Sequence, residues 1–134
     1  MIRVLTAGTW DLFHIGHLNI IKESIALGTE LFVGVSSDEL VEKQKGHKPL
    51  IPAKQRIEII KNIVGVDTVY EQYEILPTYD VKSFSPDIIT IGSDWEGKEL
   101  EGLTWFKEND GTVMYLPYTD GVNTTDLKER ILAS

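Results

Sequence analysis

Four short, mostly apolar runs divide the chain, and each is followed at once by glycine, serine or proline. They lie at Ile2–Ala7, Leu31–Val35, Ile88–Ile91 and Val113–Leu116. Because these runs do not alternate apolar with polar residues, the strands they predict are buried on both faces. Such strands are typical of a parallel sheet enclosed between two layers of helices, and they disfavour an antiparallel sheet with one face in water.

Segments in which apolar residues have helical spacing lie between the runs. Apolar residues recur three or four positions apart over 18–25, before Gly28, and over 57–63, after Pro52. Residues 127–132 predict a closing helix capped by Thr124 or Thr125, and Val66–Tyr70 predicts a short further strand. We therefore predict an α/β class: a single-domain, Rossmann-like three-layer fold over residues 1–134, with a mostly parallel central sheet of about five strands.

Charge and composition narrow the classes of function. The chain has 13 Lys and Arg against 21 Asp and Glu, a formal net charge of −8, which disfavours binding to long nucleic acids or anionic membranes. It has no cysteine, which excludes disulfides and zinc-thiolate sites. No apolar run reaches the roughly 18 residues of a membrane span, and the start lacks the layout of a signal peptide. We expect a cytoplasmic protein.

The segments that follow the predicted strands hold most of the unusual polar combinations. They are Gly8–His17, Ser36–Lys48, Gly92–Lys98 and Pro117–Thr125. In open parallel sheets, ligands bind beyond the carboxyl ends of the strands. The four segments are therefore predicted to meet at one edge of the sheet and to form one site.

His14 and His17 stand three residues apart at the start of the first predicted helix. Free backbone amides at a helix N-terminus favour anions, and two imidazoles beside them can donate to phosphate oxygens, with Gly16 leaving room for the phosphate. One alternative is an ordinary polar pair that satisfies local hydrogen bonds. Another is a zinc site, for which His47 and carboxylates would have to supply the remaining ligands.

The residues around this pair carry a family resemblance. Gly8–Asp11 followed by His14–His17 resembles the GTFD…HxGH motif of the nucleotidyltransferase superfamily, specifically of its cytidylyltransferases. The likeness continues at Ser37–Glu39, Arg56 and Gly92–Lys98. Residues 119–125 are similar to the RTEGISTT motif of bacterial glycerol-3-phosphate cytidylyltransferases, so the resemblance spans essentially the whole chain.

This resemblance implies a site and its partners. His14 and His17 would be catalytic, binding the triphosphate and stabilising the transition state, and residues 119–125 would close over the nucleotide. Mg²⁺ or another divalent cation and a homodimer are also implied. The residues implied to bind the nucleotide are Gly8, Thr9, Trp10, His14, His17, Asp94, Thr119, Gly121, Asn123 and Thr124.

Three basic residues are further candidates. Lys43 and Lys45 fall in the predicted loop after the second strand, where the family has a similar Lys-x-Lys, and their alternative is a solvated surface role. Arg56 lies near a helix start, where a cation opposes the helix dipole unless an anion is present, and its alternative is a surface ion pair. We predict catalytic roles for Lys45 and Arg56, and acceptor contacts for Lys43, Arg56 and Tyr118.

Asp94 follows a buried strand and a short turn, so its carboxylate is a candidate acceptor for a ribose hydroxyl or a base amino group. Trp95 beside it either lines the same pocket or caps the core. Asp11 can orient a histidine, bind magnesium as the metal ligand, or cap the helix, and the sequence does not separate these roles.

The predicted reaction is transfer of CMP from CTP to a small phosphorylated acceptor, giving a CDP-linked product and pyrophosphate. A phosphate monoester is largely dianionic at neutral pH, because its second pKa is about 6, so no general base is required. The alternatives are an adenylyltransferase of the same superfamily and a non-catalytic nucleotide-binding regulatory domain. A serine nucleophile at Ser36 or Ser37 lacks a supporting Gly-x-Ser-x-Gly element.

The acceptor is where the sequence departs from its nearest group. Tyr118 and Asn123 stand where the RTEGISTT motif has arginine and serine, and residues 65–81 contain no lysine or arginine, leaving Lys82 as the nearest cation. Loss of a bidentate phosphate partner suits a less anionic acceptor. We predict that glycerol 3-phosphate is a poor substrate relative to another small phosphorylated molecule, such as an amino-alcohol phosphate, a sugar phosphate or a phosphoramidate.

Overall fold

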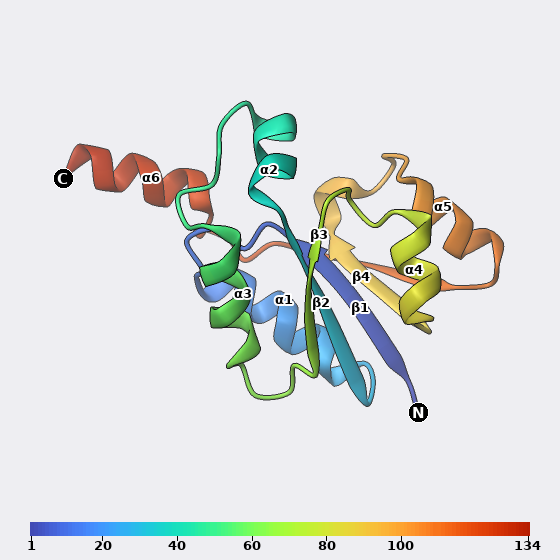
Figure 1. Cartoon of the computed structure of the whole chain (residues 1–134). Coiled ribbons are helices and arrows are strands. Elements are labelled where there is room, and N and C mark those ends of the chain that lie inside the picture. Colours follow the sequence, from blue (N-terminus) through green and yellow to red (C-terminus); the bar gives the residue numbers. More distant parts are fainter.

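The computed structural model describes all 134 residues and has one five-stranded sheet in which every pairing is parallel. The strands run in the order β3-β2-β1-β4-β5, so the chain crosses from one side of β1 to the other between β3 and β4 (Figure 1). Their bounds are β1 Arg3–Gly8, β2 Glu30–Ser36, β3 Thr68–Gln72, β4 Ile88–Gly92 and β5 Thr112–Leu116. The predicted Rossmann-like architecture is confirmed.

Helices cover both faces of the sheet, and two more stand at its carboxyl edge (Figure 1). α1 (Ile15–Ala26) and α3 (Ala53–Lys61) cover one face, whereas α4 (Thr78–Phe84) and α5 (Glu101–Glu108) cover the other. α2 (Asp38–Lys45) and α6 (Thr124–Ala133) lie at the edge, and a single 3₁₀ turn, Ser93–Trp95, follows β4. No helix has both the length and the apolar character needed to cross a membrane.

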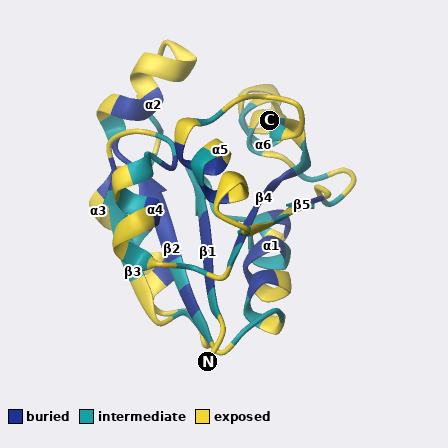
Figure 2. Cartoon of the chain, turned by 90° about the vertical axis from the view of Figure 1, so that its right-hand side faces the viewer, coloured by how far each residue is buried: buried dark blue, intermediate teal, exposed yellow.

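Two apolar cores result from the two-residue period of the strands. Val4 packs into a cluster with Ile21 of α1 and Ile60 of α3, and the next residue, Leu5, packs with Val81 of α4 on the opposite face. Both cores are closed to water, as the buried colour along the central strands in Figure 2 shows. Burial on both faces explains why the strands read as continuous apolar runs.

The sequence prediction was wrong at two places on the carboxyl edge. Lys43 and Lys45 do not lie in a loop, because they belong to α2, whose N-cap Ser37 accepts the Leu40 N–H at 3.0 Å. α6 is capped by Asn123, which accepts the Asp126 N–H at 2.7 Å, and not by Thr124 or Thr125. An asparagine cap also gives the predicted nucleotide ligand Asn123 a structural task.

Candidate active site

A pocket opens at the carboxyl edge of the sheet, where the strand ends converge. It brings together residues from the loops after β1, β4 and β5 and from the end of α2. The sequence-predicted residues that line it are Gly8, Thr9, Trp10, Asp11, His17, Lys45, Asp94, Trp95, Tyr118 and Thr124. His14 reaches the same place through its stacking on His17, with 3.8 Å between the ring centroids.

The loop between β1 and α1 is held in a strained conformation. Trp10 and Leu12 have positive φ angles, 60° and 48°, which non-glycine residues rarely adopt. The Trp10 indole is buried and donates to the carbonyl of Gly34 at 2.9 Å. Gly8 allows this packing, because a Cβ there would come 3.0 Å from the indole ring. The buried tryptophan therefore fixes the loop in place beside the pocket.

The histidine pair forms a reciprocal cap at the start of α1. Nδ1 of His14 accepts the Gly16 N–H at 3.0 Å, and Nδ1 of His17 accepts the His14 N–H at 3.2 Å. A ring nitrogen that accepts an N–H carries no proton, so each neutral ring has its proton on Nε2. Both histidines satisfy local hydrogen bonds through one nitrogen, and both keep the other nitrogen for donation to a ligand.

The structure differs from two further expectations, one about Gly16 and one about a zinc site that includes His47. The space beside Gly16 is taken by the His14 ring, since a Cβ on Gly16 would lie 2.9 Å from that ring, so the glycine serves the packing of the cap. His47 lies outside the pocket lining, with its ring beside the Lys48 carbonyl, and no three metal-binding side chains cluster in the molecule. The zinc alternative has no ligand set.

Both imidazoles are shifted toward the neutral form. Removal from water, with a smaller effect of the adjacent His14 ring, lowers the pKa of His17 to about 4 against the opposing effect of Asp11. Removal from water also lowers the pKa of His14. Neutral rings at pH 7 preserve the amide bonds to Nδ1, because a protonated Nδ1 would repel those amides.

We expect His17 to titrate near pH 4 in the folded protein. The folded-state pKa lies below the ordinary value of 6.5, so protonation favours the unfolded chain and stability falls as pH decreases from about 6.5 toward 4. Nitrogen-15 NMR of the imidazole measures this directly. A His17 midpoint near the ordinary value of 6.5 would contradict the burial that we assign to the pair.

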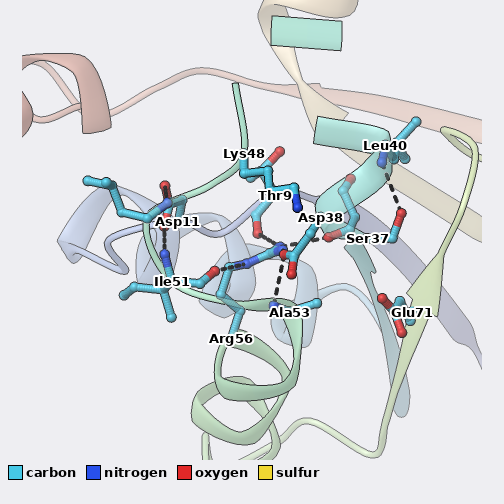
Figure 3. A network of polar contacts seen from close by, with 12 residues as sticks. Thr9, Asp11, Ser37, Asp38, Leu40, Lys48, Ile51, Ala53, Arg56 and Glu71 are labelled. Carbon is cyan, nitrogen blue, oxygen red and sulfur yellow. Dashed lines mark hydrogen bonds and ion pairs between the residues drawn. The ribbon is translucent and has the colours of Figure 1, made fainter. Parts of the chain in front are cut away.

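Arg56 is not placed as predicted. Its side chain has no exposed surface, and its guanidinium lies beneath the loops of the carboxyl edge (Figure 3). It donates at 2.7 Å to the carbonyls of Thr9, Ser36 and Ile51 and to Oδ1 of Asp38. A side chain surrounded by protein acceptors does not reach a phosphate, so the predicted catalytic and acceptor contacts of Arg56 are corrected to a positioning role.

Asp11 is likewise used by the protein itself. Its Oδ1 accepts the N–H groups of Leu12 and Ile51, at 3.1 and 2.9 Å, and its Oδ2 accepts the N–H of Leu50 at 2.9 Å (Figure 3). The carboxylate is 95% buried or more with these partners, and Lys128 stands 3.9 Å away. These bonds tie the loop before α3 to the loop before α1. The metal-ligand prediction for Asp11 therefore does not fit its surroundings.

The two lysines of α2 differ in their position relative to the pocket. Both are exposed on the last turn of α2, but only Lys45 lines the pocket. The structure therefore does not prepare the predicted acceptor contact of Lys43. Partial removal from water and the ammonium of Lys128 lower the pKa of Lys45. Lys128 belongs to α6 and was not predicted, because no motif marks it.

Asp94 and Tyr118 form a pair on the far side of the pocket from α2. The Tyr118 hydroxyl donates to Oδ1 of Asp94 at 2.7 Å. Partial burial and the Asp94 carboxylate raise the pKa of Tyr118, so the phenol stays protonated. Gly92 is required for this approach, because a Cβ there would overlap with the Tyr118 hydroxyl. Asp94, which we predicted to bind the nucleotide, and Tyr118, which we predicted to bind the acceptor, are thus hydrogen-bonded to each other.

The chain between β5 and α6 meets the pocket at Tyr118, and α6 meets it at its first residue, Thr124. Thr124 lines the pocket and donates to the carbonyl of Asp11 at 3.0 Å. Thr119 accepts from Nδ2 of Asn19 on α1 at 2.9 Å, and Gly121 turns the chain with a φ of 77°. Thr119, Gly121 and Asn123 lie outside the pocket lining. Their nucleotide contacts stay predictions.

Sequence reasoning missed one part of the site. Gln72 and Ile75 line the pocket from the end of β3 and from the loop after it. Ser36 and Gln44 also line it, and they lie in the predicted segment Ser36–Lys48 but were given no binding role. The only signal for them was position, since Ser36 directly follows a buried run. Gln72 had no signal at all, because the third strand was predicted to end at Tyr70 and ends at Gln72.

Comparison with known proteins places the chain in a family. The model of the family described as Cytidylyltransferase-like matches residues 5–130. The bifunctional protein HldE of Salmonella arizonae is 32% identical over 129 residues, which are 96% of this chain and 27% of that protein, and HldE of Salmonella paratyphi B matches equally. The chain therefore spans about a quarter of the length of these curated relatives.

Two solved structures share the fold. The lipopolysaccharide core biosynthesis protein of Thermoplasma volcanium has a TM-score of 0.71 and 31% identity, and the match covers 89% of this chain and 97% of that one. An Archaeoglobus fulgidus protein of unknown function has a TM-score of 0.67 over 91% and 94% of the two chains, but at 19% identity it supports the fold alone. With a family model matching nearly its whole length, the chain belongs to the cytidylyltransferase-like family of nucleotidyltransferases.

Proposed function

We propose that this chain is a cytidylyltransferase that transfers CMP from CTP to a small phosphorylated acceptor and releases pyrophosphate. The observation that carries the proposal is the histidine pair at the pocket. Two neutral imidazoles are held through Nδ1 by backbone amides, and their Nε2–H groups are left to donate. Donors fixed in advance suit oxygens whose negative charge grows as pyrophosphate leaves.

The reaction follows from the charges involved. A phosphate oxygen of the acceptor attacks the α-phosphorus, a new P–O bond forms, and the bond to the bridging oxygen of pyrophosphate breaks. The electron pair of that bond leaves with pyrophosphate. Since the acceptor phosphate is already mostly dianionic at neutral pH, no residue has to remove a proton. Lys45 at the pocket wall reduces the repulsion between the two anions.

A divalent cation is proposed only as part of the nucleotide substrate. Both carboxylate oxygens of Asp11 accept backbone amides, and no three acidic or histidine side chains are grouped so that they could hold a metal ion. The residues present do not form a magnesium site of their own. Mg²⁺ is therefore expected to enter bound to the triphosphate, and no step of the proposed mechanism depends on a protein ligand for it.

The covalent alternative has no support in the site. Ser37 caps α2, and the Ser36 hydroxyl accepts from Gln72, so neither serine contacts a histidine base. A regulatory nucleotide-binding domain would need no pair of oriented donors. Homodimerisation and a cytoplasmic location stay predictions.

We expect CTP to be preferred over ATP, GTP and UTP by at least about tenfold in kcat/KM, a difference of ~1.4 kcal/mol in transition-state binding. The Gly92–Lys98 and Thr119–Thr125 segments, which resemble cytidylyltransferases, support this preference. Adenylyl transfer is the second candidate, because the HxGH arrangement also occurs in adenylyltransferases. The measurement is pyrophosphate release with each nucleotide and a panel of phosphorylated acceptors. Equal or faster use of ATP would overturn the choice of nucleotide but not nucleotidyl transfer.

Glycerol 3-phosphate is expected to be a poor acceptor. Where related enzymes carry arginine, Tyr118 offers one hydroxyl, and that hydroxyl already donates to Asp94. No fixed cation on this side of the pocket then holds the acceptor phosphate. Measurement of kcat/KM with saturating CTP tests this, and a value of about 10⁴ M⁻¹s⁻¹ or more for glycerol 3-phosphate would contradict it.

A further inference from the structure

Asp94 and Tyr118 lie just beyond the ends of two neighbouring strands. β4 and β5 pair in parallel with Gly92 opposite Leu116, and each of the two side chains stands two residues beyond that paired position. Asp94 belongs to the 3₁₀ turn after β4, and Tyr118 follows Pro117. Both residues line the pocket. The hydrogen bond between them is therefore part of the wall of the candidate active site.

This bond leaves Asp94 with one oxygen that can accept from a ligand. Oδ1 accepts the Tyr118 hydroxyl at 2.7 Å, and no other hydrogen bond or ion pair of the protein reaches the carboxylate. Asp94 is exposed, so without the bond its side chain would rotate freely in water. Tyr118 thus fixes the rotamer of a carboxylate whose second oxygen, Oδ2, is left to accept.

The packing around the pair keeps the Tyr118 hydroxyl in place. A Cβ on Gly92 would overlap with this hydroxyl and would come 2.9 Å from Oδ1 of Asp94, so only glycine fits beside the bond. Partial removal from water and the Asp94 carboxylate raise the pKa of Tyr118, so the phenol stays neutral and keeps its proton for Asp94. A neutral hydroxyl whose proton is already donated is a poor ligand for a phosphate.

We propose that Tyr118 is a positioning residue for the nucleotide, which holds Asp94 so that Oδ2 alone accepts one neutral donor of the nucleoside. The inference rests on the proposed function, in which Asp94 contacts the nucleotide, and it replaces the acceptor contact predicted for Tyr118. The donor is a ribose hydroxyl or the amino group of the base, the uncharged donors that a cytidine or adenosine nucleotide offers. A carboxylate that is fixed beforehand binds such a donor without losing side-chain freedom.

A double-mutant cycle tests whether Tyr118 acts through Asp94. Tyr118→Phe removes only the hydroxyl, and we expect the Kd for CTP, measured by calorimetry without acceptor, to rise about threefold to tenfold, the size of the side-chain freedom that is lost on binding. In the Asp94→Ala background the same change should alter this Kd by less than about twofold, because no carboxylate is left to hold. Tyr115→Phe is the matched control, since its hydroxyl bonds to Lys107 and lies outside the pocket, and it should leave the Kd unchanged.

Two results of this cycle would overturn the positioning role. One is an equal rise in the Kd for CTP from Tyr118→Phe in both backgrounds, which would mean that the hydroxyl acts without Asp94. The other is an unchanged Kd for CTP together with a higher KM for the acceptor, which would mean that Tyr118 contacts the acceptor directly.

Nucleotide analogues identify the donor that Asp94 accepts. The loss of affinity caused by Asp94→Ala is measured with CTP, with 2′-deoxy-CTP, with 3′-deoxy-CTP and with UTP, which lacks the base amino group. We expect the loss to disappear with one of the three analogues and to persist with the other two. A loss that persists with all three, or disappears with two, would overturn the single-donor assignment. If the nucleotide binds with this pattern but no acceptor releases pyrophosphate, nucleotidyl transfer fails while the role of Tyr118 stands.

Discussion

His14→Ala and His17→Ala are each expected to lower kcat by about 100-fold or more, because each removes an Nε2–H donor that is held ready for the transition state. The structure adds a reason why the two losses are separate. The rings are stacked, and a different backbone amide, from Gly16 or from His14 itself, fixes each Nδ1. Loss of one ring therefore leaves the other with its own anchor. Steady-state kinetics at saturating nucleotide and acceptor measures the change.

Capping must be separated from catalysis at position 14. His14 is the N-cap of α1, and loss of a cap destabilises a helix by about 1 kcal/mol. His14→Asn keeps a capping oxygen without the Nε2 donor, so it should restore stability in urea unfolding but not kcat. His47→Ala is the matched control, since His47 is exposed and outside the pocket. If kcat stayed unchanged and only the KM for nucleotide rose, the pair would bind the ground state and the transition-state role would be wrong.

The fold was predictable because its strongest signal is local. Each buried strand appears as an uninterrupted apolar run, and the residues that follow Val35 and Ile91 converge at one edge once the strands are parallel. The rule that ligands bind at that edge then selected the segments that contain His17, Lys45 and Asp94. The family resemblance singled out these residues within the segments.

The missed helices had weak local signals. α2 has one buried pair, Leu40 and Val41, among charged residues, so its apolar face is too short to show a helical period. α4 and α5 have only seven and eight residues, and they bury Val81 and Leu103 against the sheet. In such segments tertiary packing, which the sequence does not display, decides the structure.

The roles of Arg56 and Asp11 could not be predicted because they depend on contacts between distant segments. Arg56 bonds to the carbonyl of Thr9, which is 47 residues away in the chain. Asp11 bonds to the amides of Leu50 and Ile51, 39 and 40 residues away. A charged residue beside a phosphate motif suggests a ligand or a metal site, and only the closure of these loops shows that protein groups already occupy both side chains.

Arg56→Met is expected to lower the free energy of unfolding by about 3–5 kcal/mol, because several backbone carbonyls lose their donor at about 1–3 kcal/mol each. The side chain is fully buried, and it joins the end of β2, the loop before α1 and the start of α2 through Ser36, Thr9 and Asp38. Methionine fills a similar volume but leaves these carbonyls without a donor. Urea unfolding measures the loss. Arg130→Met, on the exposed surface of α6, is the matched control and should stay within about 0.5 kcal/mol of the parent protein.

Arg56→Lys distinguishes the positioning role from direct phosphate binding. An ammonium keeps the positive charge, but its donors share one nitrogen, so it cannot reach acceptors that now surround three guanidinium nitrogens. If Arg56 positions the loops, the free energy of unfolding of Arg56→Lys should lie between those of the parent protein and of Arg56→Met. Its kcat should fall as well, because Thr9 and Lys45 are no longer held in place. If Arg56 contacted phosphate instead, lysine would keep the unfolding free energy of the parent and change only the KM for nucleotide or acceptor. Because the guanidinium has no exposed surface, we expect the first result.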